Sequence, residues 1–265
     1  MPVAVRAGRR LGFEVDGEGP TLVLVPGIGS GRKLFGTLPR RFARAGFRCV
    51  TFDPVGVPPS SAHEDDHGYD FGVAADDLWT VISESGAERA WLVGTSLGGK
   101  VSLAAAARRP DRCLGLALLA SAAVVPARAR RVYRYFEAVA ARIDGDDFGA
   151  LVAPFLFGST FQATRPQLVD DIVRGLRPGP EVRRLMIAQA RGLQEFDGQE
   201  LARAWQGPTL CIAGGEDTLT PAAEVRATAA LWPSARYVEI ADAGHSLLLE
   251  SARVFDEVVT FAGST

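Results

Sequence analysis

Cysteine and histidine are scarce in this chain, with three residues of each type among 265. The cysteines, Cys49, Cys113 and Cys211, are odd in number and far apart, and none has the spacing of a metal or redox motif. Each falls within or beside a predicted core strand, where a reduced thiol packs as a small hydrophobic side chain. We therefore expect no disulfide and no cysteine-based metal site.

An excess of positive charge and long apolar runs are also missing. The 29 basic and 31 acidic residues leave a formal net charge of −2, so there is no basic footprint of the kind that binds nucleic acid. No apolar run approaches the roughly 18 residues of a membrane-spanning helix. Residues 1–10 carry arginines with no apolar stretch behind them, so we expect no secretory signal and a cytoplasmic location. Neither nucleic acid nor a membrane is expected as a partner.

What the chain does contain is a regular alternation of short apolar runs and helical patterns. At 265 residues and 47% hydrophobic, it can form one sizeable core with an inserted subdomain. Runs that are apolar throughout are typical of strands buried on both faces, so we predict an α/β fold with a mainly parallel central sheet flanked by helices. The predicted strands are 10–15 and 21–25, which enter the sheet antiparallel, then 48–52, the run before Gly94, 114–120, 209–213 and 236–240; the predicted helices are 33–46, 71–86, 97–108, 222–231 and 252–261.

The alternation breaks between residues 122 and 205, where amphipathic helical stretches follow one another at 127–143, 165–176 and 181–193. This predicts a core domain formed by residues 1–121 and 206–265, with a helical cap inserted at 122–205. The cap is rich in aromatic residues, which suit an apolar lid over a pocket, although we expect most of them to pack the cap and only two or three to reach a substrate. They are Tyr133, Tyr135, Phe136, Phe148, Phe155, Phe157 and Phe161.

The most informative stretch is the G-x-S-x-G pattern around Ser96, which follows an apolar run and opens an Ala-rich helix. Its glycines allow two backbone segments to approach closely, while the serine occupies a strained turn and points its hydroxyl outward. A serine hydroxyl is a poor nucleophile unless a base lies within hydrogen-bond reach and a third group orients that base. Ser96 therefore predicts two partners elsewhere in the chain.

The base is chosen from three histidines. His245 follows the last predicted strand, where a loop can return it to the carboxyl edge of the sheet, and it is the preferred base. His63 and His67 flank an acidic cluster in a loop rich in proline and glycine. They could ligate a metal, but such a charge cluster is usually solvated, so we expect no metal site.

Three carboxylates compete to orient that base. Asp217 follows the predicted strand 209–213, beside the loop that holds His245. Glu216 is its neighbour and Asp242 lies close to His245, and loop sequence alone does not resolve which side chain points inward. Asp217 is preferred because of its place after that strand, and with it the chain order is Ser, Asp, His.

These residues resemble the α/β-hydrolase superfamily over residues 11–261, and the cap resembles that of its esterase and enol-lactonase branch. The resemblance implies that Ser96 is the nucleophile, His245 the general base and acid, and Asp217 the orienting acid. It also implies that the backbone N–H groups of Leu97 and Ile28 form the oxyanion hole, and that no cofactor is needed.

Two stretches depart from the pattern of that family. Many members have His-Gly where this chain has Pro26-Gly27, which leaves the backbone donor available but changes what surrounds it. Many have an Arg-Gly-x-Gly-x-Ser run after the aspartate corresponding to Asp53, where this chain has Pro54-Val55-Gly56-Val57-Pro58-Pro59-Ser60. We interpret Asp53 as a turn residue that accepts hydrogen bonds from local amides. The loop that borders the pocket can therefore have its own shape.

The expected activity is cofactor-free hydrolysis of a carboxylic ester or lactone of a small molecule through an acyl-enzyme. Hydrolysis of a carbon–carbon bond next to a carbonyl or of a thioester uses the same residues and stays open, as does a ligand receptor that does not turn over. A halide-releasing enzyme is disfavoured because it needs a carboxylate where Ser96 stands. Lys100 is expected to be a helix residue near the elbow. The sequence leaves the oligomeric state open.

Overall fold

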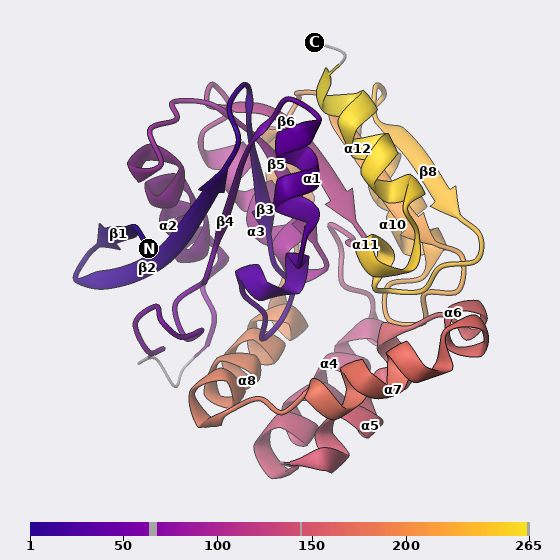
Figure 1. The fold of residues 1–265 in the computed structure, drawn as a ribbon. Coiled ribbons are helices and arrows are strands. Elements are labelled where there is room, and N and C mark those ends of the chain that lie inside the picture. The colour runs from indigo at the N-terminus through magenta and orange to yellow at the C-terminus, as the bar shows by residue number, and fades with distance from the viewer. Residues whose placement is uncertain (64–67, 144, 264–265) are drawn as a thin grey trace.

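The computed structural model describes residues 1–63, 68–143 and 145–263. They form an eight-stranded sheet with the strand order β1-β2-β4-β3-β5-β6-β7-β8, covered by helices on both faces (Figure 1). The antiparallel pairs are β1 with β2 and β2 with β4, and all other neighbours are parallel. The expected antiparallel entry holds for residues 10–15 but is wrong for residues 21–25, because β3 is parallel to both of its neighbours, β4 and β5. The predicted fold class is confirmed. The strands are β1 (Val3–Arg6), β2 (Arg9–Asp16), β3 (Thr21–Val25), β4 (Arg48–Phe52), β5 (Ala90–Thr95), β6 (Cys113–Leu119), β7 (Thr209–Gly214) and β8 (Arg236–Ile240).

The central strands are apolar because both of their faces are buried. In β3, Leu22 packs in a cluster with Phe42 on one face of the sheet, while Val23 packs in a cluster with Leu78 on the other. Successive side chains of a strand point to opposite faces, so a strand between two layers of helices needs apolar residues at every position. The sheet is thus the middle of three layers.

The helices outside the β6–β7 connection match the predicted pattern except near residue 36 and at the four-residue helix α11, which was not predicted. Near residue 36, the predicted helix 33–46 divides into a 3₁₀ turn and α1, because Gly36 adopts a positive φ of 49° and Pro39 lies in the first turn of α1. The elements are η1 (Arg32–Phe35), α1 (Leu38–Arg44), α2 (Phe71–Glu84), α3 (Leu97–Arg108), α10 (Ala222–Ala229), α11 (Leu247–Glu250) and α12 (Arg253–Gly263).

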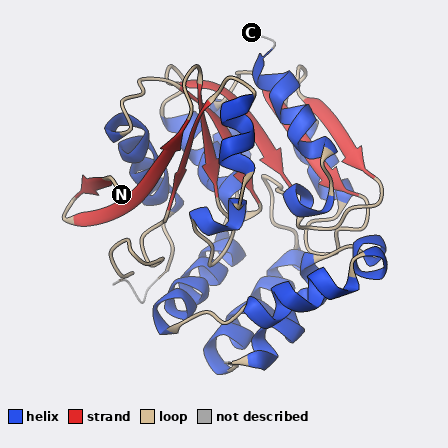
Figure 2. Cartoon of the chain, viewed as in Figure 1, coloured by secondary structure: helices blue, strands red, loops and turns tan. Residues whose placement is uncertain are grey.

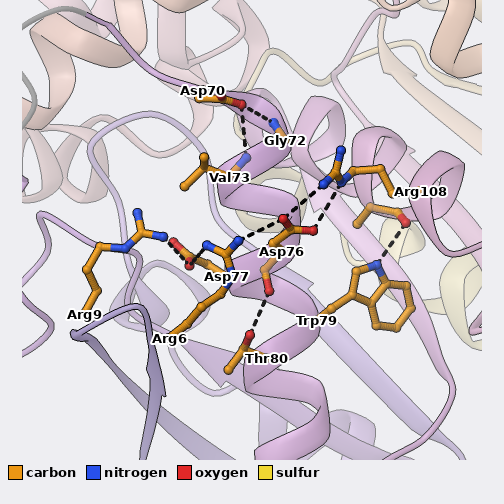
Figure 3. A network of polar contacts seen from close by, with 11 residues as sticks. Arg6, Arg9, Asp70, Gly72, Val73, Asp76, Asp77, Trp79, Thr80 and Arg108 are labelled. Carbon is orange, nitrogen blue, oxygen red and sulfur yellow. Dashed lines mark hydrogen bonds and ion pairs between the residues drawn. The ribbon is translucent and has the colours of Figure 1, made fainter.

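Strand β1 was not predicted, and side chains from α2 hold it and β2 in place. The Asp77 carboxylate accepts hydrogen bonds from Arg6 at 3.2 Å and from Arg9 at 2.9 Å, and Asp76 binds both Arg6 and Arg108 (Figure 3). These ion pairs tie the antiparallel edge of the sheet to α2. A four-residue strand is too short for its sequence alternation to be distinctive.

Between β6 and β7 the chain forms a helical segment that lies beyond the sheet, at the end to which the arrows of the parallel strands point (Figures 1 and 2). The predicted helices are present, and three further helices, α5, α6 and α9, were not predicted. Helices α6 and α9 have only six residues each, and α5 contains Gly149 and Pro154, which weaken the helical signal. The helical segment consists of α4 (Ala127–Arg142), α5 (Asp146–Leu156), α6 (Ser159–Thr164), α7 (Pro166–Gly175), α8 (Pro180–Glu195) and α9 (Gln199–Ala204).

Most of the aromatic residues of the helical segment are buried in packing contacts. Tyr135 is 37% exposed, whereas several others are buried against neighbouring helices or the core. They therefore contribute to packing more than to a free apolar surface. The buried ones are Tyr133, Phe136, Phe148, Phe157 and Phe161. None of the described helices is long and apolar enough to cross a membrane.

Gly149 provides a test of the contact between α5 and α7. A Cβ at this position would overlap the backbone carbonyl of Val173, which cannot move aside as a flexible side chain could. We expect Gly149→Ala to lower the free energy of unfolding by about 1–3 kcal/mol despite the better helix propensity of alanine. Denaturant titration measures the change.

Gly175, the last residue of α7, is the matched control because a Cβ there would meet nothing within 4 Å. We expect Gly175→Ala to leave the free energy of unfolding within about 0.5 kcal/mol of that of the unmodified chain. Equal effects of the two substitutions would contradict the close contact of α5 and α7.

Candidate active site

Ser96 lies in the turn between β5 and α3 with φ 54° and ψ −120°, a backbone conformation that is costly for a residue with a side chain. Close backbone contacts hold it there. A Cβ at Gly98 would overlap the carbonyl oxygens of Val25 and Pro26, and a Cβ at Gly94 would overlap the backbone of Gly98. Glycine at both positions therefore lets α3 start directly against β3, and the turn exposes Ser96 at the carboxyl edge of the sheet.

His245 reaches this edge from the loop between β8 and α11. Its Nε2 atom is 2.9 Å from the Oγ of Ser96, and its side chain is buried. The two residues are 149 positions apart in the sequence. Only the return of the chain after the last strand brings them together.

Asp217 completes a continuous hydrogen-bonded chain of three side chains. Its Oδ2 is 2.8 Å from Nδ1 of His245, while its Oδ1 accepts the N–H groups of Leu219 and Thr220, each at 2.8 Å. These two backbone donors fix the carboxylate plane, so one oxygen always faces the imidazole. Buried charge of this kind is stable only with such partners.

The two competing carboxylates point elsewhere. Glu216 accepts hydrogen bonds from the N–H and hydroxyl of Thr160, and Asp242 is exposed. Among the three carboxylates, the structure places Asp217 against His245.

Two backbone donors lie next to Ser96. The loop after β3 passes so close that a Cβ on Gly27 would be 3.5 Å from the Cβ of Ser96. Within the described residues, the N–H groups of Ile28 and Leu97 donate to no acceptor. The N–H of Leu97 is at the start of α3, where the helix dipole favours negative charge. Both donors are therefore available to an oxyanion.

The sequence did not indicate Gln189, which holds this loop from the helical segment. Its side chain is buried, and its Oε1 accepts the N–H of Gly29 at 2.8 Å. The Tyr69 side chain also hydrogen-bonds to Gln189. Met186, one turn earlier in α8, lies against Gly29, whose φ is 62°. A glutamine within an amphipathic helix carries no sequence signal for this role.

Asp53 differs from the sequence-based interpretation. Its carboxylate accepts the N–H of Arg32 at 3.0 Å and forms an ion pair with the Arg32 guanidinium, rather than binding the amides that follow it. The partner is 21 residues away, so a local turn motif could not have indicated it. Asp53 thereby anchors the end of the loop that contains Ile28.

Lys100 is buried one helical turn after Ser96, and its Nζ lies 5.7 Å from the centre of the Phe196 ring. Burial lowers the pKa of Lys100 to about 8. Its ammonium group donates no hydrogen bond to the described part of the chain. The charge of the Glu224 carboxylate acts in the opposite direction and partly offsets this lowering of the Lys100 pKa.

A cavity of about 210 Å³ lies beside the turn. Its apolar wall includes Pro26, Leu97 and Val101, and its polar end includes Arg9 and Tyr69. Within the described chain, its lining does not include Ser96 or His245. The cavity adjoins the loop with the free N–H groups but is separate from the three hydrogen-bonded side chains.

The possible metal pair of His63 and His67 has no structural test. His63 also lines the cavity, but His67 lies outside the described residues, as do the acidic residues between them. Among the residues that are described, no group of three or more His, Cys, Asp or Glu side chains is arranged to hold a metal ion.

Comparison with known proteins places this site in context. A protein of Klebsiella pneumoniae named "Putative carbamate hydrolase RutD" is 26% identical over 244 residues, which are 91% of this chain and 90% of that protein. The enol-lactonase of Burkholderia xenovorans has the same fold, with a TM-score of 0.88 and 24% identity over 99% of this chain and 100% of its own. An esterase of Thermogutta terrifontis has a TM-score of 0.85 and 25% identity, covering 98% and 96%.

The sequence model of the alpha/beta hydrolase fold family matches residues 20–252, which extend from the start of β3 through α11 and include Ser96, Asp217 and His245. This match and the similar structures confirm both the predicted superfamily and the predicted enzyme class, a hydrolase with this fold. The chain belongs to the alpha/beta hydrolase fold family.

Proposed function

We propose that this chain is a serine hydrolase that cleaves a carboxylic ester or lactone of a small organic molecule through an acyl-enzyme. The observation that carries the proposal is the hydrogen-bonded chain from Ser96 through His245 to Asp217, with distances of 2.9 and 2.8 Å. Nucleophile, base and orienting acid stand in the order and at the distances that acyl transfer requires.

In the proposed reaction, Nε2 of His245 takes the proton of Ser96 as Oγ attacks the substrate carbonyl carbon. The Asp217 carboxylate accepts the N–H at Nδ1 and stabilises the imidazolium that forms. The developing oxyanion is stabilised by the N–H groups of Ile28 and Leu97. His245 then returns the proton to the leaving alkoxide oxygen, and water hydrolyses the acyl-enzyme by the same steps.

The relatives support the choice of a carbonyl substrate with an oxygen leaving group. One similar structure is an enol-lactonase and another an esterase, and we transfer this chemistry to the present chain as a proposal. We further propose that residues 122–205 act as a cap over the core formed by residues 1–121 and 206–265. The three buried, unpaired cysteines fit a reducing compartment, so we propose a cytoplasmic location.

The nucleophile is tested by labelling with a fluorophosphonate, which reacts only with an activated serine. The unmodified chain should be labelled once, with loss of fluoride, and Ser96→Ala should abolish labelling because no Oγ is left to attack phosphorus. Ser234→Ala, which alters an exposed serine, should leave labelling unchanged. Undiminished labelling of Ser96→Ala would disprove the assignment.

The orienting acid is tested by comparing Asp217→Asn with Asp242→Asn. An amide at position 217 can donate to Nδ1 and hold the wrong tautomer of His245, so kcat should fall by about 10⁴-fold. Asp242→Asn should change kcat little because Asp242 is exposed. Steady-state kinetics with a p-nitrophenyl ester measure both, and the reverse result would move the acid to Asp242.

The bond cleaved is tested with four substrates: an ester, a lactone, a vinylogous diketone and an acyl thioester. We expect turnover of a p-nitrophenyl acetate or a small lactone, with Ser96→Ala as the inactive control. Turnover of a vinylogous diketone or of an acyl thioester, without turnover of either ester or lactone, would replace the proposal by carbon–carbon or thioester hydrolysis. Labelling by the fluorophosphonate with turnover of none of them would favour a ligand receptor.

A further inference from the structure

Outside the hydrogen-bonded side chains already described, one carboxylate binds the backbone on both sides of His245. Glu250, at the end of α11, accepts the N–H of Gly244 through Oε2 at 2.8 Å and the N–H of Ser246 through Oε1 at 3.0 Å. Both donors are immediate neighbours of His245. The carboxylate therefore spans the backbone that sets the direction of the imidazole.

The same carboxylate also binds the helical segment. Oε2 of Glu250 accepts the N–H of Gly158, between α5 and α6, at 2.9 Å. The N–H of Ser246 donates to the carbonyl oxygen of Leu156 at 2.9 Å as well as to Glu250. The α5–α6 junction and the loop that contains His245 thus donate hydrogen bonds to the same carboxylate.

These two stretches of backbone are in direct contact. A Cβ on Gly158 would be 2.8 Å from the backbone nitrogen of Gly244, and a Cβ on Gly244 would overlap the backbone of Gly158. Because both residues are glycine, the two backbones can approach each other more closely than any side chain at either position would allow. The N–H groups of the two glycines converge on a single oxygen of Glu250.

We propose that Glu250 is a positioning residue that fixes the orientation of His245 and makes it depend on the docked position of the helical segment. This inference rests on the proposed function, since it concerns the base of that reaction. The hydrogen bonds of the Glu250 carboxylate are to the backbone N–H groups of Gly158, Gly244 and Ser246 and not to the side chains of Ser96, Asp217 or His245, so it acts through the backbone. Without it, the loop loses the only side-chain acceptor described for Gly244 and Ser246.

Glu216 offers a closely matched control. Its carboxylate binds the same junction, accepting the N–H of Thr160 at 2.8 Å and the Thr160 hydroxyl at 2.5 Å. A glutamine at position 216 can keep both Thr160 contacts, because its oxygen accepts the N–H and the hydroxyl can turn to accept from its amide. The Ser159 hydroxyl, which also binds this carboxylate, can turn in the same way. A glutamine at position 250 cannot keep the three contacts of Glu250. All three partners are N–H donors, and the amide NH₂, itself a donor, would face at least one of them.

The experiment measures kcat, KM and the rate of fluorophosphonate labelling for Glu250→Gln and Glu216→Gln. We expect Glu250→Gln to lower kcat and the labelling rate by about 10²-fold with little change in KM, because a small misplacement of the base slows only the chemical step. Glu216→Gln should keep both rates within about threefold of those of the unmodified chain. Equal effects of the two variants, or unchanged kcat in a folded Glu250→Gln, would overturn the proposal.

A second variant approaches the contact from the helical segment. Gly158→Ala would push its Cβ against the backbone of Gly244, so we expect the labelling rate of Ser96 to fall although residue 158 is not part of the hydrogen-bonded side chains. Circular dichroism and the thermal midpoint establish whether each variant is folded. If Glu250→Gln does not fold, the labelling rate of Gly158→Ala tests the proposal instead.

The outcome separates this inference from the proposed function. If the unmodified chain is labelled and Ser96→Ala is not, the nucleophile stands, and normal labelling of folded Glu250→Gln and Gly158→Ala then rejects the positioning role alone. If the unmodified chain is not labelled at all, the proposed function fails first.

Discussion

The contact between the first turn of α3 and the end of β3 is the constraint on which the site depends. Only glycine at position 98 leaves room for the carbonyl oxygens of Val25 and Pro26. Because the backbones meet there, Ser96 is held at a positive φ beside the loop after β3. The strain of that conformation, on the order of 1–3 kcal/mol, is sustained by the buried elements on either side. The N–H groups of Ile28 and Leu97 are left free at the same point.

The helical segment does more than lie over the sheet. From α8, Gln189 binds the loop that contains Ile28, and from the α5–α6 junction, Gly158 shares the Glu250 carboxylate with the loop that contains His245. Docking of the helical segment therefore supports two walls of the candidate site at once.

Local patterns were sufficient for the elements whose signals are repeated along several residues. The apolar strands, the start and end of α3 and the sheet class follow from burial and periodicity, which act within a few residues. Strand β1 and helices α6, α9 and α11 are too short to show a period. Helix α5 was not predicted, because Gly149 weakens its helical signal and is placed there by its close contact with α7, a tertiary demand that opposes helix propensity.

By itself, the sequence determined the alternation of strands and helices, the turn around Ser96 and the candidates Asp217 and His245, because each depends on residue types at a strand end. Only the tertiary structure decided which carboxylate faces His245, that Asp53 binds Arg32, and that Gln189 and Glu250 support the site. Those contacts join residues up to 160 positions apart. A hydrogen bond requires a particular distance and direction between two atoms, and across such separations only the packed fold supplies both.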